Sequence, residues 1–155
     1  MRIFISGSPG AGKTTYAKKL AQEHAVPLFH TDDLWNNQGK RMLTHEEISR
    51  AIPLDGNWII EGAYYLPDYI RRADKVIYIR ITPLQAVIRI LKRWTQDKKF
   101  RATCSFSRLL ALLHTTFWGF FLTDHIPSET NIAKHYKERD MFRLISANAK
   151  KVEII

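Results

Sequence analysis

Cysteine is nearly absent from this chain, since Cys104 is the only one among 155 residues. A single thiol excludes a disulfide within the chain and any zinc site built from cysteines, and we interpret it as a small packing residue. Long apolar runs are also missing. The longest, at 109–122, contains a histidine and is shorter than the about 20 residues of a membrane-spanning helix. The opening residues hold only a three-residue apolar run, too short for a signal peptide. We therefore expect a cytoplasmic protein.

Acidic residues are scarce relative to basic ones, with 15 Asp and Glu against 24 Lys and Arg and a formal net charge of +9. Such an excess of basic residues is typical of proteins that bind nucleic acid or another anionic surface, and also of proteins whose basic residues surround a small phosphate-rich substrate. A basic surface without either task is the third interpretation. No linker or repeat divides the chain, and 45% hydrophobic residues suffice for one core. We place a single domain over residues 1–155.

Short apolar segments alternate with helical patterns along the chain. Buried strands are predicted at 2–6, 26–31, 58–62, 75–81 and 141–147. Helices are predicted at 13–24, 68–73, 82–94 and 128–140, and another from a capping box formed by Thr44 and Glu47. The final residues, 150–155, fit a short helix or a strand. This alternation predicts a parallel sheet covered on both faces, with ligands at the carboxyl ends of its strands.

The stretch GSPGAGKTT fits the pattern G-x-x-x-x-G-K-[ST] and lies between a predicted strand and a predicted helix. Glycines let successive backbone N–H groups point at phosphate oxygens, and the helix adds its positive dipole end. Lys13 then brings a charge to the β- and γ-phosphates, while the Thr14 hydroxyl holds Mg²⁺. The alternative is a tight turn without a ligand. The predicted nucleotide-binding residues are Gly7, Ser8, Pro9, Gly10, Ala11, Gly12, Lys13, Thr14 and Thr15.

Carboxylates follow two of the predicted strands. Asp32 and Asp33, in HTDDLW, are placed to take a hydroxyl proton or to orient magnesium, and the alternative is a helix cap. Glu61 ends the WIIEG strand and would orient magnesium through water or position the attacking group, unless it is an exposed strand-end charge. The predicted metal residues are Thr14, Asp32 and Glu61, and the predicted acceptor-binding residues are Asp32, Trp35, Glu61 and Tyr64.

Two arginines in the predicted helix 82–94 lie four residues apart. Arg89 and Arg93 therefore share one helix face and can span neighbouring phosphates during phosphoryl transfer, or they form a solvated basic face. With Lys13, Asp32 and Asp33 they complete the predicted catalytic set. The segment 98–101 and Arg108 are weaker candidates for a mobile lid. The six histidines show no metal-ligand spacing, and we interpret them as surface or core residues.

The strings GSPGAGKTT, HTDDLW, NWIIEGAYY and ADKVIYIRI together resemble the adenylate-kinase-like P-loop kinases, and most of all the bacterial DNA topology modulation (FlaR-type) proteins. The resemblance runs from residue 1 to about residue 94. It implies an α/β, three-layer P-loop NTPase fold: a five-stranded parallel sheet in order 2-3-1-4-5, helices on both faces, and a lid insertion near 95–127. It also implies ATP-dependent phosphoryl transfer with Mg²⁺.

The same resemblance assigns roles to individual residues. The family's aspartate after strand two falls on Asp32, with Asp33 at a position that is usually apolar. Its acid after strand three, more often Asp, falls on Glu61, and its paired arginines are similar in placement to Arg89 and Arg93. Departures are Ala63, where the family tends to have Asn, and the apolar, aromatic character of 95–127.

Three functions are open at this point. The preferred one is ATP-dependent transfer to a small-molecule acceptor: a nucleotide, a nucleoside or a metabolite. The second is a nucleic-acid-directed protein, either a polynucleotide kinase or a DNA binder, which the net charge supports. The third is an NTPase switch that uses segment 109–122 as a partner surface, although we favour a core helix there. The loop motif alone does not distinguish ATP from GTP.

Overall fold

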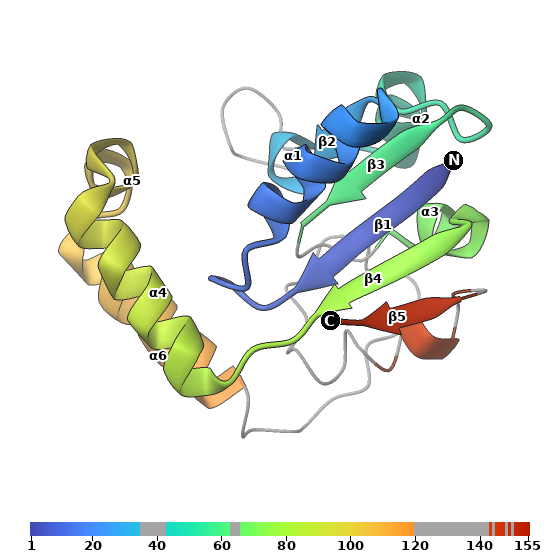
Figure 1. Cartoon of the computed structure of the whole chain (residues 1–155). Helices are drawn as coiled ribbons and strands as arrows, with labels where there is room; N and C mark the ends of the chain where they lie inside the picture. The colour runs from blue at the N-terminus through green and yellow to red at the C-terminus, as the bar shows by residue number, and fades with distance from the viewer. Residues whose placement is uncertain (35–42, 63–65, 120–142, 144, 148, 150) are drawn as a thin grey trace.

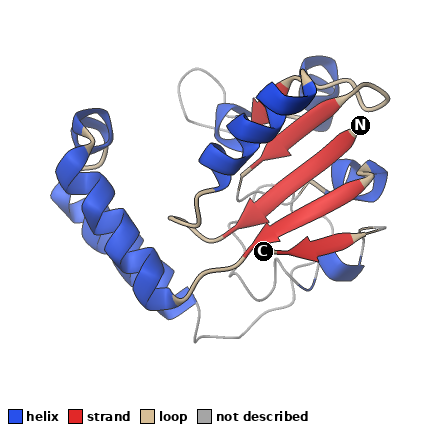
Figure 2. Ribbon diagram, viewed as in Figure 1, coloured by secondary structure: helices blue, strands red, loops and turns tan. Residues whose placement is uncertain are grey.

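The structure, a computed structural model, describes residues 1–34, 43–62, 66–119, 143, 145–147, 149 and 151–155 (Figure 1). Its five strands form one parallel sheet (Figure 2). They run in the order β2-β3-β1-β4-β5, which confirms the order that the family resemblance implied. The strands are β1 (Arg2–Gly7), β2 (Leu28–His30), β3 (Trp58–Glu61), β4 (Lys75–Ile79) and β5 (Val152–Ile154).

Helices follow each of the first four strands. Two of these helices begin at capping boxes, which Thr44 and Thr82 complete with Glu47 and Gln85 respectively. Both boxes satisfy backbone N–H groups that would otherwise lack partners in the first turn. The helices are α1 (Lys13–His24), the 3₁₀ helix η1 (Thr31–Leu34), α2 (His45–Ala51), α3 (Pro67–Arg72), α4 (Pro83–Gln96), α5 (Lys98–Thr103) and α6 (Phe106–Gly119).

Two apolar cores lie on the two faces of the sheet. Alternate residues of β1 point in opposite directions, so Ile5 packs toward α1 while Phe4 packs toward α2 and α3. Both side chains are fully buried. Because both faces are covered, the central strands are mostly apolar, as expected for a parallel sheet, and their polar residues lie mainly at the strand ends. The confirmed three-layer arrangement leaves the carboxyl ends of the strands open for polar chemistry.

The helices α4, α5 and α6 form a separate unit beyond the end of the sheet toward which the strand arrows point (Figure 1). Their own core contains Ile90, Cys104 and Leu109. Burial of Cys104 agrees with its interpretation as a packing residue. Leu109 is likewise buried, in agreement with a core helix, whereas Leu110 is 52% exposed. Residues 120–127 lie outside the described part of the chain, and the lid role of this region stays a prediction.

The prediction of a fifth strand at 141–147 is wrong. Arg143 and Ile145–Ala147 are helical, and the fifth strand is β5, in the segment for which the sequence left helix and strand open. Ile145 is fully buried in the core that also contains α3. A short apolar run suits one buried helical turn as well as a strand, so its pattern could not separate the two. The predicted helix at 128–140 lies outside the described residues.

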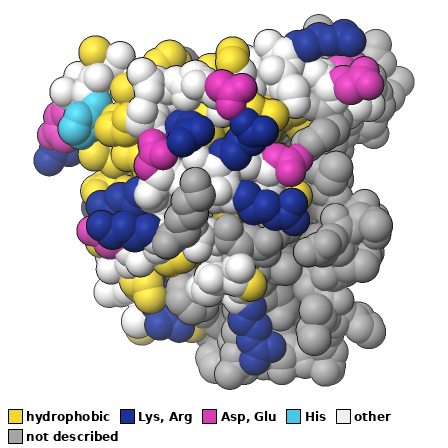
Figure 3. All heavy atoms as spheres, turned by 90° about the vertical axis from the view of Figure 1, so that its right-hand side faces the viewer, with side chains coloured by type: hydrophobic (Ala, Val, Ile, Leu, Met, Phe, Trp, Pro, Cys, Tyr) yellow, Lys and Arg dark blue, Asp and Glu magenta, His cyan; other side chains and the backbone are white. Residues whose placement is uncertain are grey.

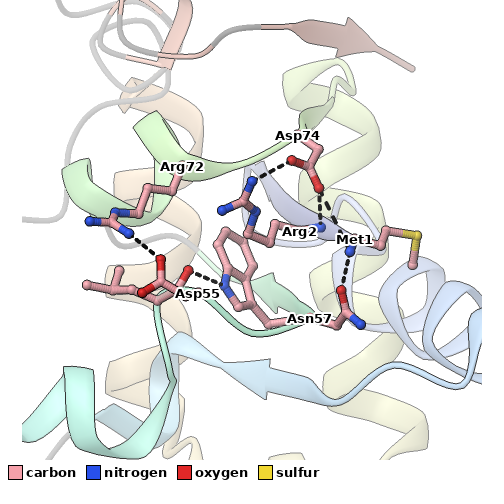
Figure 4. Close-up of polar contacts among 8 residues, drawn as sticks. Met1, Arg2, Asp55, Asn57, Arg72 and Asp74 are labelled. Carbon is pink, nitrogen blue, oxygen red and sulfur yellow. Dashed lines mark hydrogen bonds and ion pairs between the residues drawn. The ribbon is translucent and has the colours of Figure 1, made fainter.

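Ion pairs and hydrogen bonds link the segments around the amino ends of β1, β3 and β4 (Figure 4). Asp74 accepts hydrogen bonds from the backbone N and from Nη2 of Arg2, at 2.8 and 2.9 Å. These hydrogen bonds lower the pKa of the Asp74 carboxyl. The amino group of Met1 bonds Asn57, and Arg72 pairs with Asp55. On the face shown in Figure 3, acidic and basic side chains lie interspersed.

Candidate active site

The phosphate loop joins β1 to α1 and contains three glycines with positive φ. The values are +146° at Gly7, +79° at Gly10 and +92° at Gly12. A Cβ on Gly7 would lie 2.3 Å from the carbonyl oxygen of Ile79, and one on Gly10 would lie 3.1 Å from that of Ala86. Position 7 therefore requires glycine on two grounds, backbone conformation and contact with β4. The loop curls as its motif predicts.

Lys13 folds back over this loop. Its Nζ donates hydrogen bonds to the carbonyl oxygens of Gly7 at 2.8 Å and Ser8 at 2.9 Å. Pro9, Gly10, Gly12, Thr14 and Thr15 are exposed. The ammonium group is thus held at the loop while much of the loop remains accessible to a ligand.

Glu61 lies beside the first turn of α1. Its Oε1 accepts a hydrogen bond from Thr14 Oγ1 at 3.1 Å. The side chain is only 7% exposed, so the interpretation as an exposed strand-end charge is wrong. Both residues were predicted as magnesium residues, and the fold brings them into direct contact.

His30 is a member of this site that the sequence interpretation missed. Its Nδ1 lies 2.6 Å from the same Oε1 of Glu61. His30 and Glu61 are paired directly across β2 and β3, and Glu61 is paired with Ile5 of β1. A search for ligand spacing among histidines could not find it, because its partner comes from another strand. The available signal was its place at the end of a predicted strand, directly before TDD.

Asp32 and Asp33 lie in the first turn of η1, and both side chains are exposed. This position after β2 puts them at the same edge of the sheet as Glu61. Both residues lie within η1 and not at its cap position, although a carboxylate in the first turn still interacts favourably with the helix dipole. The predicted catalytic role and a stabilising role at the helix end therefore both remain open.

Thr31, the first residue of η1, packs against Gly62 directly after β3. It is fully buried, and its Oγ1 has no hydrogen-bond partner among the residues that the structure describes. A Cβ on Gly62, whose φ is +152°, would lie 1.6 Å from that Oγ1. Only glycine lets the chain after β3 pass so close to Thr31. This packing sets where η1 lies relative to Glu61.

Arg89 and Arg93 have different partners, although they lie one helical turn apart. Arg89 Nη1 donates to the carbonyl oxygens of Gly10 and Ala11, at 3.3 and 3.2 Å. Arg93 instead lies 3.6 Å from Asp97 and stacks over the ring of Phe100 at 4.4 Å from its centre. The structure therefore brings Arg89 to the phosphate loop, and it does not bring Arg93 there. Trp35 and Tyr64, predicted to bind the acceptor, lie outside the described residues.

Oxygen donors at this site fit magnesium rather than zinc. The Thr14 hydroxyl and the Glu61 carboxylate are adjacent, and Mg²⁺ is commonly held by one or two protein oxygens together with substrate phosphates and water. Within the described ranges, no group of three or more His, Cys, Asp and Glu residues could hold a metal ion without a substrate. No helix in that same part of the chain is long and apolar enough to cross a membrane.

Comparisons with known proteins identify similar kinases. The chain is 30% identical over 78 residues to a cytidylate kinase of Desulfurococcus amylolyticus, covering 50% of this chain and 42% of that protein. It is 37% identical over 60 residues to an adenylate kinase of Lachnospira eligens, covering 34% of this chain and 28% of the relative. The chain thus spans less than half the length of these two curated relatives. No protein-family model matches it.

A solved structure of shikimate kinase from Acinetobacter baumannii, in complex with shikimate, superimposes with a TM-score of 0.53. The match covers 98% of this chain and 82% of that one, at 15% sequence identity. At this identity the likeness concerns the fold alone, and it agrees with the parallel five-stranded sheet covered by helices that the structure shows.

Proposed function

We propose that this protein is a P-loop kinase that transfers a phosphoryl group from ATP to a small-molecule acceptor. The observation that carries the proposal is the contact between Thr14 of the phosphate loop and the buried carboxylate of Glu61. A loop that only shaped a turn would not need a carboxylate beside its threonine, whereas a hydroxyl and a carboxylate side by side are the oxygen donors that suit Mg²⁺ bound together with substrate phosphates. The similarity to curated adenylate and cytidylate kinases supports the same conclusion.

The proposed roles follow the position of each side chain. Lys13 neutralises charge on the β- and γ-phosphates, and the backbone N–H groups of the loop bind their oxygens. Thr14 and Glu61 hold Mg²⁺ directly or through water, and the bound ion would neutralise charge that develops on the phosphates. Asp32 orients the acceptor hydroxyl or takes its proton, with Asp33 as the alternative. Arg89 closes over the triphosphate.

Nucleotides and nucleosides are the first acceptors to test. The curated relatives are named for adenylate and cytidylate. The finer resemblance to FlaR-type proteins depends on the string from Trp58 to Tyr64 and names no acceptor. A metabolite acceptor therefore belongs in the same screen.

A nucleic-acid track is the weaker proposal. Several basic side chains of the described residues pair with acids, which reduces the charge available to a phosphate backbone. Examples are the pairs Arg2–Asp74, Arg72–Asp55 and Arg71–Asp68. DNA binding that survives physiological salt would favour this alternative. A protein that contacts many phosphates binds DNA tightly at low salt, so its affinity remains measurable at physiological salt even though it decreases steeply as the salt concentration rises.

An acceptor screen tests the proposal. ADP release from MgATP is followed with nucleosides, nucleotides, sugars, other hydroxylated metabolites and short oligonucleotides, with Lys13→Ala as the inactive reference. We expect ADP release that depends on one class of small acceptor. Equal release with and without acceptors would support an NTPase switch instead, and release only with oligonucleotides would support a polynucleotide kinase.

A further inference from the structure

Two side chains from two different elements lie within hydrogen-bond distance of Oε1 of Glu61. Thr14 approaches from α1 at 3.1 Å, and His30 approaches from β2 at 2.6 Å. An ionised carboxylate can only accept hydrogen bonds, so Nδ1 of His30 is the donor in this pair. The roles proposed above involve Thr14 and Glu61, but they assign no role to the shorter contact, which His30 makes with Glu61.

Strand register explains why His30 reaches this position. Leu28 pairs with Ile59 and His30 pairs with Glu61, two residues further along both strands. Leu28 and Ile59 belong to the core beside α1. Because side chains on a strand alternate with a period of two, His30 and Glu61 point to that same face, where α1 begins with Lys13 and Thr14.

The contact restricts the Glu61 side chain. A glutamate has several rotatable bonds, and the weak bond from Thr14 alone leaves other rotamers accessible. A second, shorter bond to the same oxygen selects the rotamer in which the carboxylate faces Thr14. Groups that hydrogen-bond a metal-binding carboxylate in this way orient it, and their loss typically lowers metal affinity by about 10–100-fold.

We propose that His30 is a positioning residue, which holds the Glu61 carboxylate against the Thr14 hydroxyl and so shapes the place where a Mg²⁺–nucleotide complex binds. This inference rests on the proposed function. His30 touches neither phosphate nor acceptor in this role, and it acts only through Glu61. A purely structural link between β2 and β3 is the competing explanation.

Two amide variants separate these explanations. His30→Asn places an amide NH₂ near the position of Nδ1 and keeps the bond to Glu61. His30→Gln places the amide near the position of Nε2 and removes that bond, while the residue remains polar and of similar size. His24→Ala, at the exposed end of α1, is the control for loss of a histidine elsewhere.

The measurement is ATP binding by calorimetry, once with excess EDTA and once with Mg²⁺, together with thermal unfolding of each variant. The ratio of the two affinities is the magnesium-dependent gain. We expect His30→Gln to reduce this gain by about tenfold, within the range for outer partners of metal ligands. Binding in EDTA should stay near that of wild type in every variant. His30→Asn and His24→Ala should retain most of the gain.

The result that would overturn the inference is an equal magnesium-dependent gain in wild type and His30→Gln, including the case in which Gln lowers only the unfolding temperature. Loss of the gain in His30→Asn as well would also contradict it, because Asn keeps the bond. A wild-type protein without any magnesium-dependent ATP affinity would contradict the proposed function and the inference together. The first two outcomes leave the proposed function intact.

Discussion

Arg89 of α4 lies against Ala11 of the phosphate loop, with its Nη1 3.2 Å from the Ala11 carbonyl oxygen. Gly10 is also close to this helix, since a Cβ there would lie 3.1 Å from the Ala86 carbonyl oxygen and 3.5 Å from the Ile90 side chain. The helix that starts the α4–α6 unit is therefore attached directly to the loop proposed to bind ATP.

Arg89→Ala should lower kcat/KM for ATP by about 10–100-fold, because hydrogen bonds to charged groups contribute roughly 1.5–3 kcal/mol. The sequence predicts a loss for Arg93→Ala as well. The structure favours a smaller loss there, because Arg93 is engaged by Asp97 and Phe100. Steady-state kinetics of both variants decide this, and unchanged activity in both would contradict the role of the arginine pair.

Lys13→Ala should reduce phosphoryl transfer by about 10²–10³-fold, the usual effect of removing one transition-state donor. The protein should remain folded, since Lys13 contacts loop carbonyls rather than a core. Circular dichroism checks the fold and ADP release checks the activity. Lys18→Ala, on an exposed position of α1, serves as the control. Turnover near that of wild type in Lys13→Ala would refute the interpretation of the loop.

Asp32→Asn should lower kcat much more than it lowers ATP affinity, because the proposed task is to orient or deprotonate the acceptor. Asp33→Asn is the matched comparison, since both carboxylates lie exposed in the first turn of η1. Separate measurement of kcat and of ATP binding is required. An effect confined to Asp33→Asn would assign the acceptor role to Asp33 instead of Asp32. No effect from either variant would favour the stabilising role at the helix end for both residues.

Gly62→Ala should destabilise the protein by about 3 kcal/mol, from overpacking and from a backbone conformation that alanine rarely adopts. The new Cβ would lie 1.6 Å from Thr31 Oγ1, in a fully buried site. Gly56→Ala is the control, because its Cβ would make an ordinary contact 3.5 Å from the Pro53 carbonyl oxygen. Urea unfolding measures both, and equal stability of the two variants would contradict the close packing of β3 on η1.

Local features were the easiest to predict from the sequence. The helix at 13–24 has the predicted bounds, and the capping box of Thr44 and Glu47 forms as predicted. Both depend on residues within a few positions of one another. The strand predicted at 141–147 failed because a short buried apolar run is compatible with either secondary structure until its partners are known.

The sequence by itself indicated the curled backbone of the loop at residues 7–15, since its glycine spacing allows the positive φ values found there and a helix follows directly. It also indicated the parallel sheet through the alternation of strands and helices. Only the tertiary structure decided that His30 joins Glu61 and Thr14, and that Arg89 rather than Arg93 meets the loop. The physical reason is that these contacts join residues far apart in the chain. They depend on strand register and helix placement, and a shift of one residue in register would turn a side chain to the opposite face of the sheet.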